Sequence, residues 1–221
     1  ATDTVERWQA VNCIVALPVF VAARVVVKPP DFLREAAART RYSPWLVANL
    51  HIERALHDRP GAPPSWDNVL YGSASLGYVD AMHQNLQRVP GATVLTYYLA
   101  LGDAPDNRLR LLQQPWSHWR DTIVAELSVP HPDLREKLRR MDITRYGHAM
   151  AVPVPGTLRN GHFQVRNRLS PASAGHEQLQ EYERLTPSEG RLHFAHSDWS
   201  GYSVFEEAFT RGHAAAVSLR A

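Results

Sequence analysis

Along the middle of the chain, hydrophobic and polar positions follow the pattern of short β-strands. Stretches rich in β-branched and aromatic residues alternate with turns rich in Pro, Gly and Asp, and they predict strands at 45–52, 69–71, 78–83 and 93–101. Because short turns join these segments, we expect an antiparallel sheet. A further extended segment is predicted from 142 to 154, where it enters the rigid run of residues 153–156.

Helical signals flank and interrupt this pattern. Pro29-Pro30-Asp31 is typical of a helix start and predicts a helix to about residue 41. After Pro115, four large apolar residues recur at spacings of three and four and predict a helix that ends at Pro130: Trp116, Trp119, Ile123 and Leu127. A second helix is expected from about 132 to 141.

The two ends of the chain each contain a predicted strand. Residues 4–17 become apolar and β-branched toward their end, and Pro18 closes this strand before a loop. At the other end we expect a strand at 191–195, a polar turn at 196–202 and a helix with one apolar face: Phe205, Ala208, Phe209, Gly212 and Ala216. Residues 159–190 are polar and aperiodic, which predicts a loop insertion with a short helix near 178–184.

The composition is that of an ordinary globular protein. The 221 residues are 44% hydrophobic and 21% charged, enough for one large or two small domains. The net charge of +2 creates no field that would attract nucleic acid or an anionic membrane, so neither is an expected partner. The apolar run 13–27 is interrupted by Pro18 and Arg24 and is too short to span a bilayer. The basic residues are almost all arginine, which hints at a bacterial source.

The single cysteine, Cys13, allows no internal disulfide, and no Cys/His pair has zinc-site spacing. We therefore predict no metal site, and a reducing, cytoplasmic compartment is the default expectation. The chain starts without methionine and in a segment that already has strand character. This start indicates a fragment of a longer polypeptide.

The turn before the last helix carries the strongest candidate chemistry. A helix start presents unpaired N–H groups and the positive end of the helix dipole to a ligand. The carboxylate of Asp198 would accept hydrogen bonds from the hydroxyls of a ribityl chain, and the amides near Ser203 and Val204 would face a pyrophosphate or the edge of a flavin ring. The competing interpretation is a capped helix start, with Ser203 as N-cap and Glu206 completing a capping box.

Several segments resemble the flavin-containing amine oxidases. Residues 192–208 with Gly212 are similar to the last FAD-binding motif of that family, and residues 13–18, Cys-Ile-Val-Ala-Leu-Pro, are similar to its strand and turn beside the flavin. Residues 66–69 and 145–150 are similar to segments of a bacterial subfamily, so the likeness covers most of the chain except 159–190. Two departures, His196 and Glu206, stand where many members have glycine.

The resemblance implies a mixed α/β (α+β) fold that combines a partial FAD-binding domain with a substrate domain of antiparallel sheet and helices. Residues 1–27 and 187–221 would belong to the FAD-binding domain and residues 28–186 to the substrate domain. The turn beside the flavin and the terminal turn would share one crevice. The cofactor-binding residues implied there are Asp198, Ser197, Trp199, Ser203, Val204 and Pro18.

One part of a complete FAD site is missing from the sequence. No Gly-x-Gly-x-x-Gly motif occurs, and in FAD proteins of this kind that motif lets the pyrophosphate approach the backbone of an N-terminal segment. The missing segment is therefore an expected partner, supplied upstream in the same polypeptide or by a separate chain. We expect the 221 residues alone to bind FAD weakly or not at all.

On the substrate side, the resemblance implies that the antiparallel sheet roofs a pocket for a small molecule over the flavin. The implied reaction is a two-electron oxidation of a C–N or similar bond, and no catalytic acid or base is assigned because the flavin performs the redox step. The pocket candidates are Trp66, Tyr78, Tyr146, His148 and Tyr202. For each of these aromatic residues the alternative is core packing, and for His148 a structural hydrogen bond.

Two other functions remain as alternatives. The fold could serve a non-catalytic binding module, because a fold does not determine an activity. A serine hydrolase is the remote alternative, since residues 201–205 begin like a nucleophile elbow around Ser203. However, Phe205 stands where the elbow needs glycine, and only His213 follows in the sequence.

Overall fold

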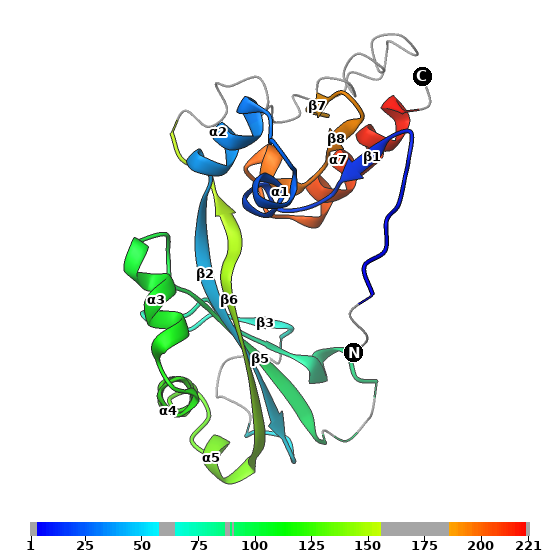
Figure 1. Ribbon diagram of the computed structural model, residues 1–221. Coiled ribbons are helices and arrows are strands. Elements are labelled where there is room, and N and C mark those ends of the chain that lie inside the picture. The colour runs from blue at the N-terminus through cyan, green and yellow to red at the C-terminus, as the bar shows by residue number, and fades with distance from the viewer. Residues whose placement is uncertain (1–3, 58–64, 87–88, 90, 156–185, 220–221) are drawn as a thin grey trace. The chain divides into compact units, whose positions relative to one another are not determined.

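The structure, a computed structural model, describes residues 4–57, 65–86, 89, 91–155 and 186–219. The chain divides into two compact units (Figure 1): unit 1 comprises Ala1–Arg41 and Ala151–Ala221, and unit 2 comprises Tyr42–Met150. Helices and two sheets among the described residues confirm the predicted mixed α/β class. The sequence analysis instead divides the chain after residues 27 and 186. The predicted roles of the two domains, in binding FAD and in binding substrate, stay predictions.

Unit 2 is built on a five-stranded sheet with the strand order β3-β4-β5-β2-β6. Its strands are β2 (Arg41–Ile52), β3 (Asp67–Asn68), β4 (Gly77–Asp80), β5 (Thr93–Ala100) and β6 (Leu138–Val152). The pairs β3–β4, β4–β5 and β5–β2 are antiparallel, which confirms the predicted type of sheet. Along β2 and β5 every second side chain is buried, as the two-residue period of a strand requires.

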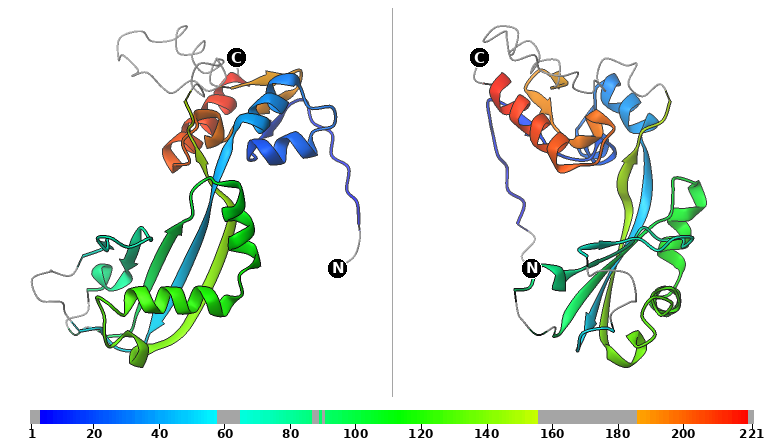
Figure 2. Two further views of the ribbon diagram at one scale, coloured as in Figure 1. Left: turned by 90° about the vertical axis from the view of Figure 1, so that its left-hand side faces the viewer. Right: turned by 180° about the vertical axis from the view of Figure 1, so that it is seen from behind.

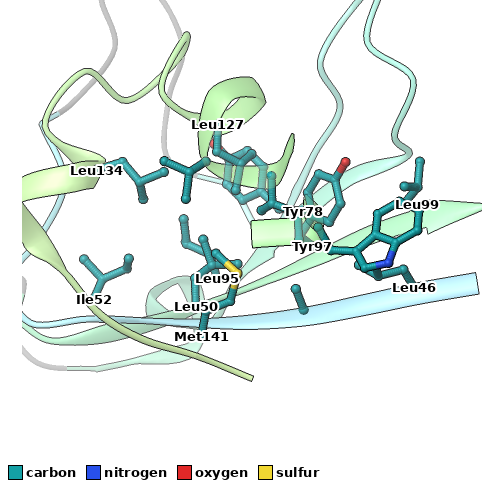
Figure 3. Packing of buried hydrophobic residues seen from close by; sticks show 14 of the residues in the cluster. Leu46, Leu50, Ile52, Tyr78, Leu95, Tyr97, Leu99, Leu127, Leu134 and Met141 are labelled. Atoms are coloured by element: carbon teal, nitrogen blue, oxygen red, sulfur yellow. The ribbon is translucent and has the colours of Figure 1, made fainter. Parts of the chain in front are cut away.

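Helices α3 (Pro105–Gln113), α4 (Trp116–Leu127) and α5 (Leu134–Lys137) cover one face of this sheet (Figure 2). The core forms where they meet the inward side chains of the strands, with Leu50 and Leu95 from the sheet near Leu127 and Leu134 from the helical layer (Figure 3). On α4 the predicted stripe is buried at Trp119, Ile123 and Leu127, whereas Trp116 is half-exposed at the first turn.

Several predicted boundaries in unit 2 are wrong. The strand expected at 69–71 is instead the short β3 just before it, and Val69 and Tyr71 are exposed. The strand expected at 78–83 ends at Asp80, because the side chain of Asp80 accepts the N–H of Met82 and starts a 3₁₀ turn, Ala81–Gln84. The helix expected at 132–141 is only one turn, α5, since β6 begins at Leu138. Helix α3 was not predicted, because its polar sequence buries only Leu111.

Unit 1 contains a three-stranded sheet with the order β1-β8-β7. Strand β1 (Cys13–Val15) pairs parallel with β8 (Leu192–Phe194), and β7 (Ser188–Glu189) pairs antiparallel with β8. The helical elements are α1 (Val19–Val25), α2 (Asp31–Arg39), the 3₁₀ turn η3 (Ser197–Ser200) and α7 (Phe205–Ser218).

The sequence overestimates the first strand and misses the first helix. Only Cys13–Val15 forms a strand, and before it Val5, Trp8 and Val11 are all more than 70% exposed. After Pro18 the chain forms α1 rather than a loop, because the Pro18 carbonyl accepts the N–H groups of Val21 and Ala22. The insertion expected at 159–190 lies mostly outside the described residues, as does the short helix near 178–184, and its last part contains β7.

The predicted apolar face of the last helix is exposed instead of packed into a core. Phe205 is 77% and Phe209 63% exposed, whereas the buried residues of α7 are Arg211, Ala214 and Ala215. The sequence shows apolar or small residues on both sides of this helix, so the hydrophobic period alone does not select the buried side.

A buried ion pair fastens α5 to the end of β2. The Lys137 ammonium group donates to Asp133 Oδ2 at 2.6 Å and to the Ala55 carbonyl at 2.6 Å, and both charged side chains are less than 10% exposed. Burial alone would raise the pKa of Asp133, but hydrogen bonds from Lys137 and from the N–H of His57 hold that pKa below its ordinary value.

We predict that Lys137→Met lowers the free energy of unfolding by about 2–3 kcal/mol, because it leaves a buried carboxylate without its cation. The lowered pKa of Asp133 means that this stabilisation is present above its unfolded pKa of about 3.9 and is lost as the pH falls further. Urea unfolding followed by circular dichroism at pH 7 and pH 3 measures both effects.

Lys28→Met is the matched control, because Lys28 is the other lysine of the sequence and is exposed. Equal stability of the Lys137 and Lys28 variants at pH 7 would contradict the assigned role of the buried pair.

Candidate functional site

One buried carboxylate joins the two turns that the sequence singled out. Asp198 lies in η3, is 2% exposed, and accepts the backbone N–H of Val19 through Oδ2 at 3.0 Å. Val19 is the first residue of α1, where a helix has N–H groups without internal partners, and the preceding Pro18 has no side chain that could cap them. Asp198 therefore caps α1 from 179 residues away in the sequence.

The joined turns lie at the carboxyl edge of the parallel pair β1 and β8. The two strands run side by side from Cys13–Leu192 to Val15–Phe194, and the N–H of Ala195 continues the pairing to the Val15 carbonyl at 3.1 Å. In sheets with parallel strands, ligands bind outside the carboxyl ends, where strands turn into helices. The structure thus brings the Ala16-Leu17-Pro18 turn and the terminal turn to one edge of this sheet.

His196 shapes the start of the terminal turn. Its Nδ1 accepts the N–H of Asp198 at 3.1 Å and lies 3.2 Å from Asp198 Oδ1. A neutral ring that accepts through Nδ1 carries its proton on Nε2, which leaves a donor on the side chain. The side chain is 26% exposed, whereas the neighbouring Asp198 is buried. The His196 side chain therefore takes part in the hydrogen bonding of the turn.

Arg211, on α7, forms hydrogen bonds to the same turn, a role that the sequence analysis did not predict. Its guanidinium group donates through Nε to Ser200 Oγ at 2.9 Å and through a terminal nitrogen to the Trp199 carbonyl at 2.8 Å. Arg211 is 1% exposed, and this burial lowers its pKa to about 10, opposed by the charge of Glu207. The available signal was its position on α7 in line with Ala214 and Ala215, since small residues mark the packed side.

The other predicted cofactor residues have mixed surroundings. Ser197 and Trp199 are buried, and the Trp199 ring packs with Phe32 and Phe194 at centroid distances of 6.1 Å from each. Pro18 is half-buried at the turn after β1. Trp199 thus supports the turn through an aromatic cluster.

The capping box expected at the start of α7 is wrong. The hydroxyl of Ser203 accepts the N–H of Ala151 at 2.7 Å, and Val204 is the N-cap without a side-chain cap bond. Val204 itself donates its N–H to the Tyr202 carbonyl at 3.0 Å.

The five substrate-pocket candidates come from four different segments of the chain. Tyr78 on β4 is a core residue instead, because it is 2% exposed and its hydroxyl lies 2.6 Å from Nε2 of the buried His131. Tyr146 and His148 lie two residues apart on β6, so they share one face of that strand. His148 makes an edge-to-face contact with Tyr42. Exposed Trp66 precedes β3, and exposed Tyr202 belongs to unit 1.

A pocket of about 490 Å³ lies elsewhere in unit 2, where the sequence had indicated none. Its polar lining includes His51, Glu53, Asn85 and Arg139, and its apolar lining includes Met82 and Val94. His51 Nε2 lies 2.9 Å from Asp142 Oδ2, and Arg140 together with His51 lowers the pKa of Asp142. The charged lining is already paired within the protein, since Glu53 bonds to Arg139.

Two features are absent from the described part of the chain. No group of three or more His, Cys, Asp or Glu residues there could hold a metal ion. No helix among the same residues is long and apolar enough to cross a membrane.

Parts of several solved oxidase structures have a fold similar to that of this chain. Cyclohexylamine oxidase from Brevibacterium oxydans IH-35A has a similar structure, with a TM-score of 0.62 and 14% identity over 95% of this chain and 42% of that chain. A single-site mutant of putrescine oxidase, from a redesign of its cofactor binding, gives a TM-score of 0.61 and 14% identity over 95% and 43%. A putative protoporphyrinogen oxidase from Exiguobacterium sp. 255-15 gives 0.52 and 10% over 94% and 41%.

The chain therefore spans about two fifths of the length of these solved structures. No family model matches the chain, and no curated protein matches it. At such low identity the likeness establishes a shared fold and does not determine a function.

We predict that Arg211→Met destabilises unit 1 by about 2–3 kcal/mol, because it removes two hydrogen bonds from a buried charged group. Thermal unfolding followed by tryptophan fluorescence measures this change, since Trp199 lies in the affected turn. Arg191→Met is the control, because Arg191 is exposed. If both variants unfold at the same temperature, Arg211 does not hold the turn.

Proposed function

We propose that the chain is part of an FAD-dependent oxidoreductase related to the amine oxidases. The observation that carries the proposal is the hydrogen bond between Asp198 and Val19, which unites the two segments that resemble flavin-binding motifs. The similarity of the fold to cyclohexylamine oxidase and putrescine oxidase supports it independently. The proposal concerns the whole protein, since the chain spans only part of those oxidases.

The donor set at the carboxyl edge fits the polar middle of FAD. Asp198 uses Oδ2 for Val19, but each carboxylate oxygen has two lone pairs, so a ribityl hydroxyl can share this group. The Nε2–H of His196 adds a donor for a hydroxyl or phosphate oxygen. FAD supplies the hydride acceptor, and these residues orient it.

On the substrate side, we propose that β6 contributes to the pocket wall. Tyr146 and His148 share one face of this strand and are exposed, as is Trp66. Aromatic walls exclude water from the reacting bond, which favours the two-electron oxidation of a small amine-like molecule. Tyr78 does not belong to this wall because it lies in the core.

The hydrolase alternative receives no support from the surroundings of Ser203. Its hydroxyl accepts a backbone N–H, and His213, the histidine that follows it, stacks on Phe209 at a centroid distance of 6.3 Å.

A non-catalytic binding module differs from an enzyme in one measurable property. In the intact parent protein, anaerobic addition of an amine substrate reduces the flavin of an enzyme and leaves that of a binding module oxidised.

We predict that Asp198→Ala in the intact parent weakens FAD binding by about 1–3 kcal/mol, because a charged hydrogen-bond acceptor is lost and the two turns separate. Asp198→Asn should lose less, since its amide oxygen still accepts the Val19 N–H. Fluorescence titration with FAD measures the affinities, and Asp106→Asn on the exposed start of α3 serves as control. Unchanged affinity in Asp198→Ala would remove the main cofactor assignment.

A separate prediction concerns the chain by itself. The 221 residues contain no glycine-rich pyrophosphate motif, so the purified chain should bind FAD weakly or not at all. The absorbance ratio at 450 and 280 nm of the purified chain measures bound flavin. A stoichiometrically yellow preparation without any second polypeptide would show that no further segment is needed.

A further inference from the structure

The pocket of about 490 Å³ in unit 2 is built at one end of the five-stranded sheet. β2 ends there at Ile52 and β5 begins there at Thr93, and these two residues are partners in the register of the strands. The 3₁₀ turn and the start of β6 supply further walls, through Met82 and Arg139. The volume lies in the range of pockets that bind small molecules.

The lining of this pocket combines an apolar surface with a few charged or polar side chains. Its apolar residues are Ile52, Ala81, Met82, Ala92 and Val94. The charged side chains are Glu53 and Arg139, and His51 adds an imidazole ring. Ligand pockets typically have such a lining, in which the polar groups fix the orientation of the ligand. The pocket therefore suits a molecule with an apolar body and one polar end.

The acidic side chain of the lining is already bound by two arginines. Glu53 accepts a hydrogen bond from Nε of Arg139 through Oε2, and its Oε1 lies 3.3 Å from Nε of Arg54. The hydrogen bond from Arg139 is the main cause that holds the pKa of Glu53 below its ordinary value. A cationic ligand would meet a carboxylate whose charge is already balanced, which disfavours binding of a cation.

The carboxylate beside His51 is satisfied in the same way. Asp142 accepts from Nε of Arg140 at 2.9 Å through Oδ1, and its Oδ2 lies 2.9 Å from Nε2 of His51. Because Arg140 and His51 lower the pKa of Asp142, this group is an ionised acceptor, and the His51 nitrogen that faces it carries a proton. The acids at this end of the sheet therefore offer little to a further donor.

Arg139 is the lining group that keeps donors for a ligand. Its side chain is 65% exposed, and its bond to Glu53 uses Nε. Within the described part of the chain, its two terminal nitrogens donate no hydrogen bond. The N–H groups of a guanidinium lie in a planar fork, which matches the two oxygens of a carboxylate. An acceptor with this geometry is the polar end that the pocket can bind.

We propose that the pocket binds a small carboxylate with an apolar body, and that Arg139 binds the carboxylate group. The apolar body lies against Met82 and Val94, and the bond from Glu53 to Nε holds the guanidinium group in place. The inference concerns unit 2 by itself and does not depend on the proposed function.

A titration of the isotope-labelled 221-residue chain with phenylacetate, followed by NMR, tests the proposal. Phenylacetate has a carboxylate beside an aromatic ring, and phenylacetamide has nearly the same shape without the charge. We expect millimolar phenylacetate to shift the backbone amide signals of residues 51–53, 81–85 and 92–94. Phenylacetamide should bind at least about fivefold more weakly, because it cannot form the charged pair with Arg139.

Variants of the lining provide the second part of the test. Arg139→Met removes the guanidinium group and should weaken phenylacetate binding at least about tenfold. Arg120→Met is the matched control, because Arg120 also pairs with an exposed carboxylate, that of Asp121, and does not line the pocket. Ala92→Asp adds a repelling charge at an exposed position of the lining and should weaken binding too, whereas Ala92→Ser should not. Amide spectra that match the wild type verify that each variant is folded.

A wild-type chain whose signals do not shift with phenylacetate overturns the proposal, as do shifts confined to residues outside the pocket. Equal affinity of the wild type and the folded Arg139→Met variant overturns it as well, and so does equal affinity for phenylacetate and phenylacetamide. Inorganic phosphate that shifts the same amide signals with the affinity of phenylacetate would show that the pocket selects charge alone, which contradicts the assigned class of ligand.

Discussion

The hydrogen bond from the Val19 N–H to the buried carboxylate of Asp198 is the contact on which the site depends. A carboxylate in the interior is costly unless its oxygens are bonded, and a helix start leaves N–H groups that need acceptors. Each group satisfies the other, and as a result the turn after β1 and the turn after β8 are held at one edge of the sheet. Any ligand bound at this edge contacts two segments that are far apart in the sequence.

The terminal turn is fixed independently of a ligand. His196 caps η3 at its start, Gly201 ends it in the left-handed region at φ 67°, and Arg211 binds its carbonyl and hydroxyl groups from α7. The left-handed backbone conformation at this position favours glycine, because a residue with a side chain would be strained there. A binding site with such a supported turn loses little entropy when a cofactor is bound. The hydrogen bonds of Arg211 to Ser200 and Trp199 offset part of the unfavourable desolvation of its buried guanidinium group.

The sequence predicts those parts of the fold in which one face is buried and the other is not. Alternation along β2 and β5 and the stripe on α4 are confirmed because the helical layer covers a single face of the sheet. The apolar run after Pro18 has no period that separates a loop from α1, and α7 has apolar residues on both sides, so local pattern fails at these two elements. The partner of Asp198 and the burial of Arg211 arise only from tertiary packing. Sequence patterns therefore predict the terminal turn, but they do not predict the Asp198–Val19 contact or the burial of Arg211.

Hydrogen exchange of the intact parent protein with and without FAD tests the central claim most directly, because it reports binding at individual backbone segments. The account predicts that FAD slows exchange in the peptides covering residues 16–22 and 196–205, which the Asp198 contact holds together. Slower exchange elsewhere in the parent, with both of these peptides unchanged, would contradict the assignment of the cofactor site to the edge formed by β1 and β8.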